Sequence, residues 1–200
     1  MKSLFRPRVS ELKRIFTDIP VLDTDRLILR KISVTDAADM YEYSKNPNVT
    51  RYLTWSPHED EEYTRRYIKY LQGQYMSGEF YDWGLELKEN GKMIGTCGFT
   101  SINERDRSAE VGYVINESYW HKGYATEALK KVIAFGFDHM LLKRIEAKHI
   151  EGNDMSASVM KKCGMKLDGI LRDSMYIKGE YKTIHVYSII REEYLYNDIR

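Results

Sequence analysis

Glu110 lies in the segment AEVGYVI, residues 109–115, whose side chains alternate between two faces as they do in a β-strand. A carboxylate on a partly apolar strand face is a candidate general base, because it can accept a proton from an amine within hydrogen-bond reach. The alternative is structural: a glutamate near a strand end can form an ion pair with Arg105 or Arg107. Residue types alone leave both interpretations open.

The loop HKGYAT, residues 121–126, stands between this strand and an amphipathic segment that predicts a helix. The first backbone N–H groups of a helix have no partner inside it, and the helix dipole adds about half a positive charge there. Because Gly123 and Ala125 are small, a pyrophosphate can approach the backbone closely, and Lys122 can add a cation. An ordinary strand-to-helix turn remains the alternative, since the loop matches neither common phosphate-binding glycine pattern.

A second polar helix start lies in EGNDMSASVMKKCGM, residues 151–165. Asn153 and Ser156 both suit helix capping, which is the structural interpretation. The functional interpretation is that both side chains face the same ligand as the glycine loop. Spacing alone does not choose between these interpretations.

Composition argues against several classes of function. The 200 residues are 42% hydrophobic and 30% charged, which is ordinary for a globular domain. With 31 basic and 30 acidic residues the net charge is +1, so no overall basic field favours nucleic acid. Two distant cysteines and five scattered histidines predict neither a disulfide framework nor a metal site. Because no disulfide framework is predicted, we expect a protein of the reducing cytoplasm. No apolar run approaches the ~20 residues that span a bilayer, and the start lacks the apolar core of a signal peptide.

Hydrophobic periodicity predicts one mixed sheet covered by helices. Hairpins are predicted at Asn90-Gly91, a pair that favours a type I′ turn, and at Lys178-Gly179. A helix is predicted from Ser56, with a capping box completed by Glu59. The predicted strands cover 26–32, the two arms of 81–102, 109–115, 143–150, 166–173 and 183–190, and the predicted helices cover 33–46, 56–71, 123–139 and 154–163.

Residues 1–20 are interpreted as an N-terminal extension, and residues 21–200 as a single domain. A short helix packed on the domain is favoured over a partner-binding or membrane-surface helix, and Pro20 is expected to end it. Apolar residues recur near helical spacing in the extension: Val9, Leu12, Phe16 and Ile19.

Four motifs follow one another along the chain: TDRLILR (24–30), GKMIGTCGF (91–99), AEVGYVINESYWHKGYATEAL (109–129) and EGNDMSASVMKKCGMKLDGILR (151–172). Together they resemble the GNAT N-acetyltransferase superfamily, and more narrowly its RimJ/RimL-type branch of ribosomal-protein N-terminal acetyltransferases. The likeness spans residues 22–194 and leaves the extension outside. It implies an α/β (α+β) fold with a mixed, mostly antiparallel central sheet, one splayed strand pair and flanking helices.

The resemblance also implies acetyl-CoA as co-substrate, no metal, and direct transfer of acetyl to an amine without an acyl-enzyme. Glu110 would be the base facing the acceptor amine, and a strand N–H between Val111 and Tyr113 would steady the oxyanion. Asn153 and Ser156 would border the sulfur end of the donor. The remaining donor-binding residues would act through their backbones: Tyr113, Val114 and Ile115 on the pantetheine, and His121, Lys122, Gly123, Tyr124, Ala125 and Thr126 on the pyrophosphate.

Three positions depart from the general family pattern. Trp120 replaces a common Gln or Arg, a change that fits the RimJ/RimL-type branch. Met160 stands where many members have a tyrosine acid, so Ser156, a water or no acid at all remain the options for protonating the CoA thiolate. Thr183 lies near a position where this branch often has an aspartate, which leaves the acceptor open.

The sequence therefore predicts an acetyl-CoA-dependent N-acetyltransferase that acts on a primary amine: a protein N-terminus, a polyamine or a small amine. The alternative is a non-catalytic acyl-CoA-binding module, which the missing tyrosine at Met160 keeps open. We expect no membrane or nucleic-acid partner, and a homodimer stays open. On the acceptor side, Trp55 is interpreted first as a packing residue and His58 as a surface residue.

Overall fold

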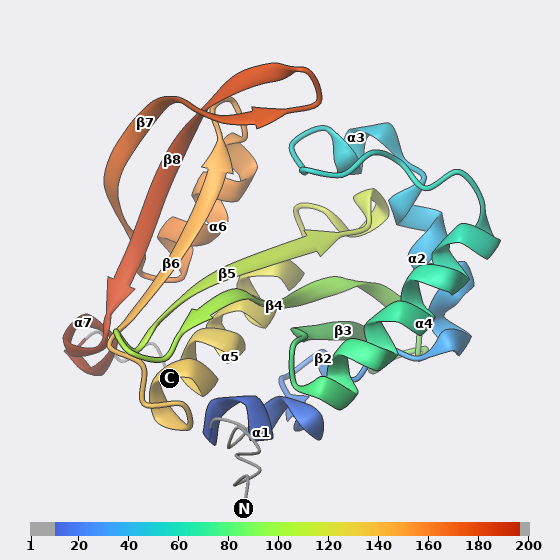
Figure 1. Ribbon diagram of the computed structural model, residues 1–200, viewed down its shortest axis with the longest axis horizontal. Coiled ribbons are helices and arrows are strands. Elements are labelled where there is room, and N and C mark those ends of the chain that lie inside the picture. Colours follow the sequence, from blue (N-terminus) through green and yellow to red (C-terminus); the bar gives the residue numbers. More distant parts are fainter. Residues whose placement is uncertain (1–10, 197–200) are drawn as a thin grey trace, which may run out of the picture.

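A computed structural model describes residues 11–196, so Val9 of the predicted extension lies outside the described residues. Its core is an eight-stranded sheet in the order β1-β2-β3-β4-β5-β6-β8-β7 (Figure 1). The strands are β1 (Leu22–Asp23), β2 (Leu27–Arg30), β3 (Tyr81–Leu87), β4 (Met93–Asn103), β5 (Ser108–Ile115), β6 (Arg144–Ile150), β7 (Lys166–Ile177) and β8 (Glu180–Ile190). The helices are α1 (Glu11–Thr17), α2 (Ala37–Ser44), α3 (Pro47–Thr50), α4 (Glu61–Ser77), α5 (Tyr124–Asp138), α6 (Asp154–Lys162) and α7 (Arg191–Tyr196), with 3-10 turns η1 (Val34–Asp36) and η2 (Glu117–Tyr119).

Neighbouring strands of the sheet run antiparallel except for β5 and β6, which run parallel. Their pairing ends at Val111 and Ala147, although β5 continues to Ile115 and β6 to Ile150. Each strand keeps its outer partner, since β4 pairs with β5 and β8 pairs with β6 along their lengths. The two halves of the sheet therefore diverge between β5 and β6, and the predicted mixed sheet with a splayed strand pair is confirmed (Figure 1).

Helices cover both faces of the sheet. One face carries Trp83 and Cys97 and packs on α5, whose inner residues Leu129 and Val132 are fully buried. The opposite face carries the next residues along each strand and packs on α2 and α4. Helices α2 and α4 do not reach the part of this second face near β5, where the site described below lies (Figure 1).

Helix α1 places the ring of Phe16 in the main core. Phe16 is 0% exposed. Its ring makes edge contacts with the rings of Tyr81, Trp83, Phe99 and Phe135 at centroid distances of 4.8–6.4 Å. The indole of Trp83 donates to the carbonyl of Pro20 at 2.7 Å, which fixes the chain after α1.

Two predicted local structures differ from those observed. The helix expected from Ser56 begins at Glu61, because Asp60 accepts a hydrogen bond from the Tyr63 N–H at 2.6 Å and acts as the N-cap. At the first hairpin only Gly91 has a positive φ, so the turn is not type I′, which requires two such residues. The second hairpin is confirmed, with positive φ at both residues of its Lys178-Gly179 turn.

Replacing Phe16 by alanine should lower the free energy of unfolding by about 3–5 kcal/mol, because a fully buried aromatic side chain leaves a cavity between α1 and the sheet. Denaturant unfolding monitored by circular dichroism measures the change. Val21→Ala is the control, since Val21 is 65% exposed and its loss should cost less than about 0.5 kcal/mol. Equal stability of the two variants would show that the α1 contact contributes nothing.

Candidate active site

The direction of the peptide groups in β5 determines which of them face the gap. The N–H of Lys143 donates to the carbonyl of Arg107 at 2.6 Å, on the β6 side. The N–H of Asn116 donates to the carbonyl of Ile94 at 2.8 Å, on the β4 side. Because alternate residues of a strand direct their peptide groups to the same edge, odd-numbered residues of β5 point towards β6 and even-numbered residues towards β4.

Tyr113 and Ile115 therefore direct their peptide groups into the gap beyond the last β5–β6 pair. The carbonyl of Ile115 already accepts a hydrogen bond from the indole of Trp120 at 2.7 Å, which leaves its N–H on that edge. Val114, the third predicted residue of this strand, turns its peptide groups to β4 and lines the gap with its side chain. The gap thus offers strand-like hydrogen bonding to an extended ligand.

At the end of the gap, α5 begins without a side-chain cap. Gly123 is the N-cap residue and adopts a left-handed conformation with φ 84°, which favours glycine. The first intrahelical bond runs from the N–H of Glu127 to the carbonyl of Gly123 at 3.0 Å. The N–H groups of Tyr124, Ala125 and Thr126 precede it and have no partner inside the helix, and these three residues line the cleft. Free N–H groups at a helix start can hold an anion, so this arrangement could accept a pyrophosphate.

The two residues before Gly123 differ in placement. His121 lines the cleft, and its φ of 61° turns the chain immediately before the helix. Lys122 is not part of the cleft wall, and its ammonium lies 5.0 Å from the ring centre of Tyr119. The structure thus brings His121 to the other predicted residues and leaves the Lys122 side chain apart.

Arg26, which sequence reasoning did not single out, holds the glycine loop in place. Its guanidinium donates to the carboxylate of Glu127 at 2.7 Å and to the carbonyl of Lys122 at 2.9 Å, and lies 4.3 Å from the ring centre of Tyr124. Thr24 donates to the same carboxylate at 2.7 Å. Burial opposes ionisation of Glu127, but these hydrogen bonds and the charge of Arg26 lower its pKa below the ordinary value. Arg26 lies in the TDRLILR motif about a hundred residues earlier, so no local pattern could reveal the contact.

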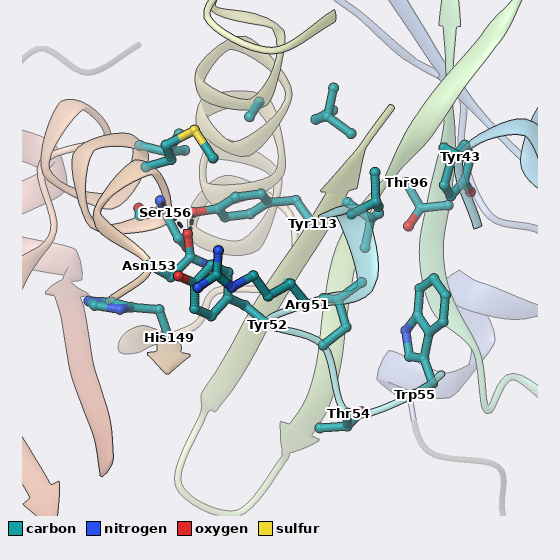
Figure 2. Close-up of a pocket in the computed structure, with 18 of the residues that line it drawn as sticks. Tyr43, Arg51, Tyr52, Thr54, Trp55, Thr96, Tyr113, His149, Asn153 and Ser156 are labelled. Carbon is teal, nitrogen blue, oxygen red and sulfur yellow. Dashed lines mark hydrogen bonds between the residues drawn. The ribbon is translucent and has the colours of Figure 1, made fainter. Parts of the chain in front are cut away.

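Tyr113 and Ser156 connect β5 with α6 across the gap (Figure 2). Their hydroxyl oxygens lie 2.8 Å apart, and the Tyr113 hydroxyl also donates to the Ser156 carbonyl at 3.1 Å. Burial raises the pKa of Tyr113 well above the ordinary value and outweighs the opposite effect of Ser156, so the phenol stays protonated. Asn153 caps α6 by accepting the N–H of Ser156 at 3.3 Å. Its capping role is therefore present, and both Asn153 and Ser156 also line the cleft.

Glu110 forms an ion pair, but with a residue that the sequence did not indicate. Its Oε2 lies 2.6 Å from the Nζ of Lys148 on β6, so the partner is neither Arg105 nor Arg107. Lys148 also lies 3.3 Å from Glu146. Burial alone would lower the pKa of Lys148, but the hydrogen bonds and charges of the two glutamates raise it, so Lys148 stays protonated.

One cleft of about 1530 Å³ joins these features. It combines the gap, the start of α5 and the second face of the sheet. Eleven of the twelve site residues named from the sequence line it: Glu110, Tyr113, Val114, Ile115, His121, Gly123, Tyr124, Ala125, Thr126, Asn153 and Ser156. Met160, which stands where a tyrosine acid was considered, is also in the wall.

An aromatic group lines the cleft on the side away from the glycine loop. The ring of His58 lies 5.4 Å from Trp55, 4.9 Å from Tyr63 and 5.6 Å from Tyr67, and its Nδ1 lies 2.8 Å from the hydroxyl of Thr64. The expectation of a surface histidine is therefore wrong. Because α4 begins at residue 61 and not at the predicted start, residues 55–58 fold back onto its first turns. Burial lowers the pKa of His58 below the ordinary value.

Asp82 is a further acidic residue of the cleft wall that sequence reasoning missed. Burial raises its pKa to about 7, although hydrogen bonds from the Thr96 side chain and the Trp83 backbone act in the opposite direction. Its Oδ1 is covered and accepts no hydrogen bond within residues 11–196. The sequence could not indicate this role, because a single aspartate in the strand YDWGLEL belongs to no recognised catalytic or binding motif.

Comparison with known proteins gives the family. The family description Acetyltransferase (GNAT) domain matches residues 26–166. The chain belongs to the GNAT acetyltransferase family. YoaA of Bacillus subtilis, an uncharacterised N-acetyltransferase, is 36% identical over 172 residues, which cover 86% of this chain and 97% of YoaA.

Two further relatives extend the comparison. A GNAT-family acetyltransferase from Bacillus anthracis has a crystal structure that superposes with a TM-score of 0.78 at 27% identity, covering 86% of this chain and 99% of that one. YdaF of Bacillus subtilis, whose name suggests a ribosomal N-acetyltransferase, is 29% identical over 108 residues, or 54% of this chain and 59% of YdaF. The predicted N-acetyltransferase identity and the likeness to the RimJ/RimL-type branch are confirmed.

Among residues 11–196, no cluster of His, Cys, Asp and Glu side chains is arranged to hold a metal ion. In the same part of the chain, no helix combines the length and apolar character needed to span a membrane. Cys97 and Cys163 are buried free thiols.

Asp82→Asn should change how stability depends on pH. A folded-state pKa of about 7 against an ordinary 3.8 means that folding takes up a proton between these values, so Asp82 costs stability as pH rises from about 4 to 7. The amide mimics the neutral acid. The free energy of unfolding of the variant, relative to the wild type, should therefore increase by on the order of a few kcal/mol as pH rises from about 4 to 7. Above about pH 7 the difference should stay constant. Denaturant unfolding at successive pH values measures this difference.

The matched control is Asp106→Asn, in the exposed turn between β4 and β5. Its stability difference from the wild type should show no such trend. A flat Asp82→Asn difference over the same pH range would refute the raised pKa of Asp82.

Proposed function

We propose that this GNAT protein transfers the acetyl group of acetyl-CoA directly to a primary amine, and that the cleft described above is where it does so. The acceptor is a protein N-terminus, a polyamine or a small amine. The observation that carries the proposal is the continuity of two features: the unpaired β5 edge leads directly to the uncapped start of α5. An extended amide chain and a pyrophosphate, in that order, match these two features.

The donor residues would act mainly through their backbones. Tyr113 and Ile115 would bond the amides of the pantetheine in the manner of an added strand. The N–H groups of residues 121–126, above all those at the start of α5, would hold the pyrophosphate. Asn153 would border the sulfur end together with Ser156. This assignment is supported by the direction of the β5 peptide groups and by the absence of a side-chain cap on Gly123.

The acceptor amine would approach from the side of Glu110. Its nitrogen attacks the thioester carbonyl carbon, Glu110 takes the proton that the nitrogen loses, and the C–S bond breaks. The N–H of Tyr113, first beyond the last β5–β6 pair, would stabilise the oxyanion. Alignment of the two reactants can supply roughly 7–11 kcal/mol of the barrier reduction.

Protonation of the departing thiolate would fall to Ser156. The hydroxyl of Tyr113 lies 2.8 Å from the Ser156 oxygen and can orient the serine hydroxyl towards the sulfur. Solvent would restore the proton that Ser156 gives up and take the proton held by Glu110, so that the phenol of Tyr113 stays neutral. Met160 cannot take part, because a thioether has no proton to donate.

A non-catalytic acyl-CoA-binding module is the second candidate. The close ion pair between Glu110 and Lys148 supports it, since the carboxylate already has a cationic partner at 2.6 Å. For the enzyme, the same contact means that the acceptor ammonium competes with Lys148 for Glu110. The experiment on Glu110 below separates the two candidates.

Two further expectations belong to this proposal. We expect the protein to act in the reducing cytoplasm, and its two buried free thiols agree with that location. A homodimer would bury the exposed apolar side chains of β7, among them Leu167, Ile170 and Leu171, which are 48–50% exposed. Sedimentation analysis of the wild type and of Ile170→Lys would test the dimer.

Glu110→Gln should reduce the rate of CoA release by about 10²–10⁴-fold with any accepted amine, because the amide keeps the shape but cannot take a proton. Release is followed with a thiol reagent across an amine panel, and acetyl-CoA binding is measured by calorimetry. Binding should stay within about twofold, since Glu110 lies outside the donor gap. Full turnover by the variant at every pH would show that Glu110 is not the base. If no amine of the panel makes the wild type release CoA, the non-catalytic module is favoured.

Arg26→Ala should weaken CoA binding by about 3- to 10-fold, because the guanidinium holds the loop that would bind the pyrophosphate. The expected loss is small because the Arg26 side chain is 46% exposed, so water screens its ion pair with Glu127. Calorimetric titration with CoA measures the effect. Arg65→Ala is the control, since Arg65 pairs with Glu61 on α4 and does not line the cleft. Identical CoA affinities of both variants would show that the loop needs no support from Arg26.

A further inference from the structure

Asp82 lies on the same face of the sheet as Glu110. Its register partner on β4 is Gly98, whose own partner on β5 is Gly112. Residues directly opposite in antiparallel strands share a face, and Glu110 is two residues from Gly112 on β5. With strands about 4.8 Å apart and a rise of about 3.4 Å per residue, the Cα atoms of Asp82 and Glu110 are on the order of 12 Å apart.

The row between the two acids carries little side-chain bulk. Gly98 presses against Asp82, since a Cβ at Gly98 would come within 2.7 Å of the Asp82 Oδ1. Gly112 lines the cleft directly. The two carboxylates therefore stand at separate places in one cleft, and the residues between them are small: Gly98, Gly112 and Thr100, whose methyl group lies beside Gly112.

Aromatic rings surround the Asp82 end of the cleft. Tyr43 from α2 and Tyr67 from α4 line the cleft together with Asp82, and so do Trp55 and Tyr63. Figure 2 shows Tyr43 and Trp55 in this part of the wall. Aromatic faces attract cations, and the attraction strengthens when the cation is removed from water.

Among residues 11–196, no positively charged side chain forms an ion pair with Asp82. The nearby imidazole of His58 has a pKa lowered by burial and stays neutral. Asp82 is partly exposed to the cleft as a whole residue. A partly buried carboxylate with no counter-charge, enclosed by aromatic rings, provides what a cationic group of a ligand requires.

We propose that Asp82, with the aromatic wall of Tyr43, Trp55, Tyr63 and Tyr67, is a subsite for a second cationic nitrogen of the acceptor. The acceptor would then carry at least two cationic groups, one presented to Glu110 and one held at Asp82. This inference rests on the proposed transferase function and narrows its substrate class. It makes Asp82 a determinant of specificity, remote from the bonds that change.

The test uses α,ω-diaminoalkanes of four to ten carbons and the alkylamines of equal length. In the presence of CoA, calorimetry measures their binding to the wild type and to Asp82→Asn. The wild type should bind the best diamine at least 10-fold more tightly than its matched alkylamine, and Asp82→Asn should bring that ratio close to one. Asp106→Asn should keep the wild-type ratio. Turnover with acetyl-CoA should show the same selectivity in kcat/KM.

No binding of any diamine, equal binding of diamine and alkylamine by the wild type, or a selectivity that survives Asp82→Asn would overturn the Asp82 subsite. CoA binding to the same variants is measured separately and tests the proposed donor site. Asp82→Asn should not change it, because Asp82 does not face the gap between β5 and β6. If CoA binds and the diamines do not discriminate, only the subsite fails; if CoA does not bind, the transferase proposal itself fails.

Discussion

The site depends on the separation of β5 from β6. Each of these strands is fully paired on its outer side, so the sheet holds together as two halves while the parallel contact between them stops at Val111 and Ala147. An unpaired strand edge normally attracts another strand or water, because exposed peptide groups need partners. Here the edge faces the cleft between the two halves of the sheet, where an extended ligand could supply the missing hydrogen-bond partners.

Three contacts over long sequence separations keep this gap and its surroundings in place. Arg26 and Thr24 fix the first turn of α5 through Glu127. Tyr113 joins β5 to α6 through Ser156. The hydrogen bonds of Thr24 and Tyr113 join partly buried groups, so the loss of either leaves an unsatisfied partner and costs more than the loss of a surface contact.

The acidic groups of the cleft divide by their surroundings. Glu110 stands beside Lys148 and is held as an ion pair. Asp82 has no such partner, and burial raises its pKa to about 7. These two carboxylates of one cleft thus differ in whether a cation already pairs with them, and the difference comes from neighbours on other strands. Sequence inspection singled out only Glu110, because that residue lies in a recognisable motif.

Local sequence determined the elements: alternation in 109–115, glycine at 123 and the turn at Lys178-Gly179 all have local causes and lie where the sequence predicts them. The start of α4 was misplaced because Asp60 competes with Ser56 as N-cap, and local propensity ranks two such candidates poorly. Tertiary structure alone decided which distant groups meet, namely Lys148 with Glu110, Arg26 with the glycine loop, and Asp82 with the aromatic wall. These meetings depend on strand order and register, which arise from packing of the whole sheet, so no short stretch of sequence contains them.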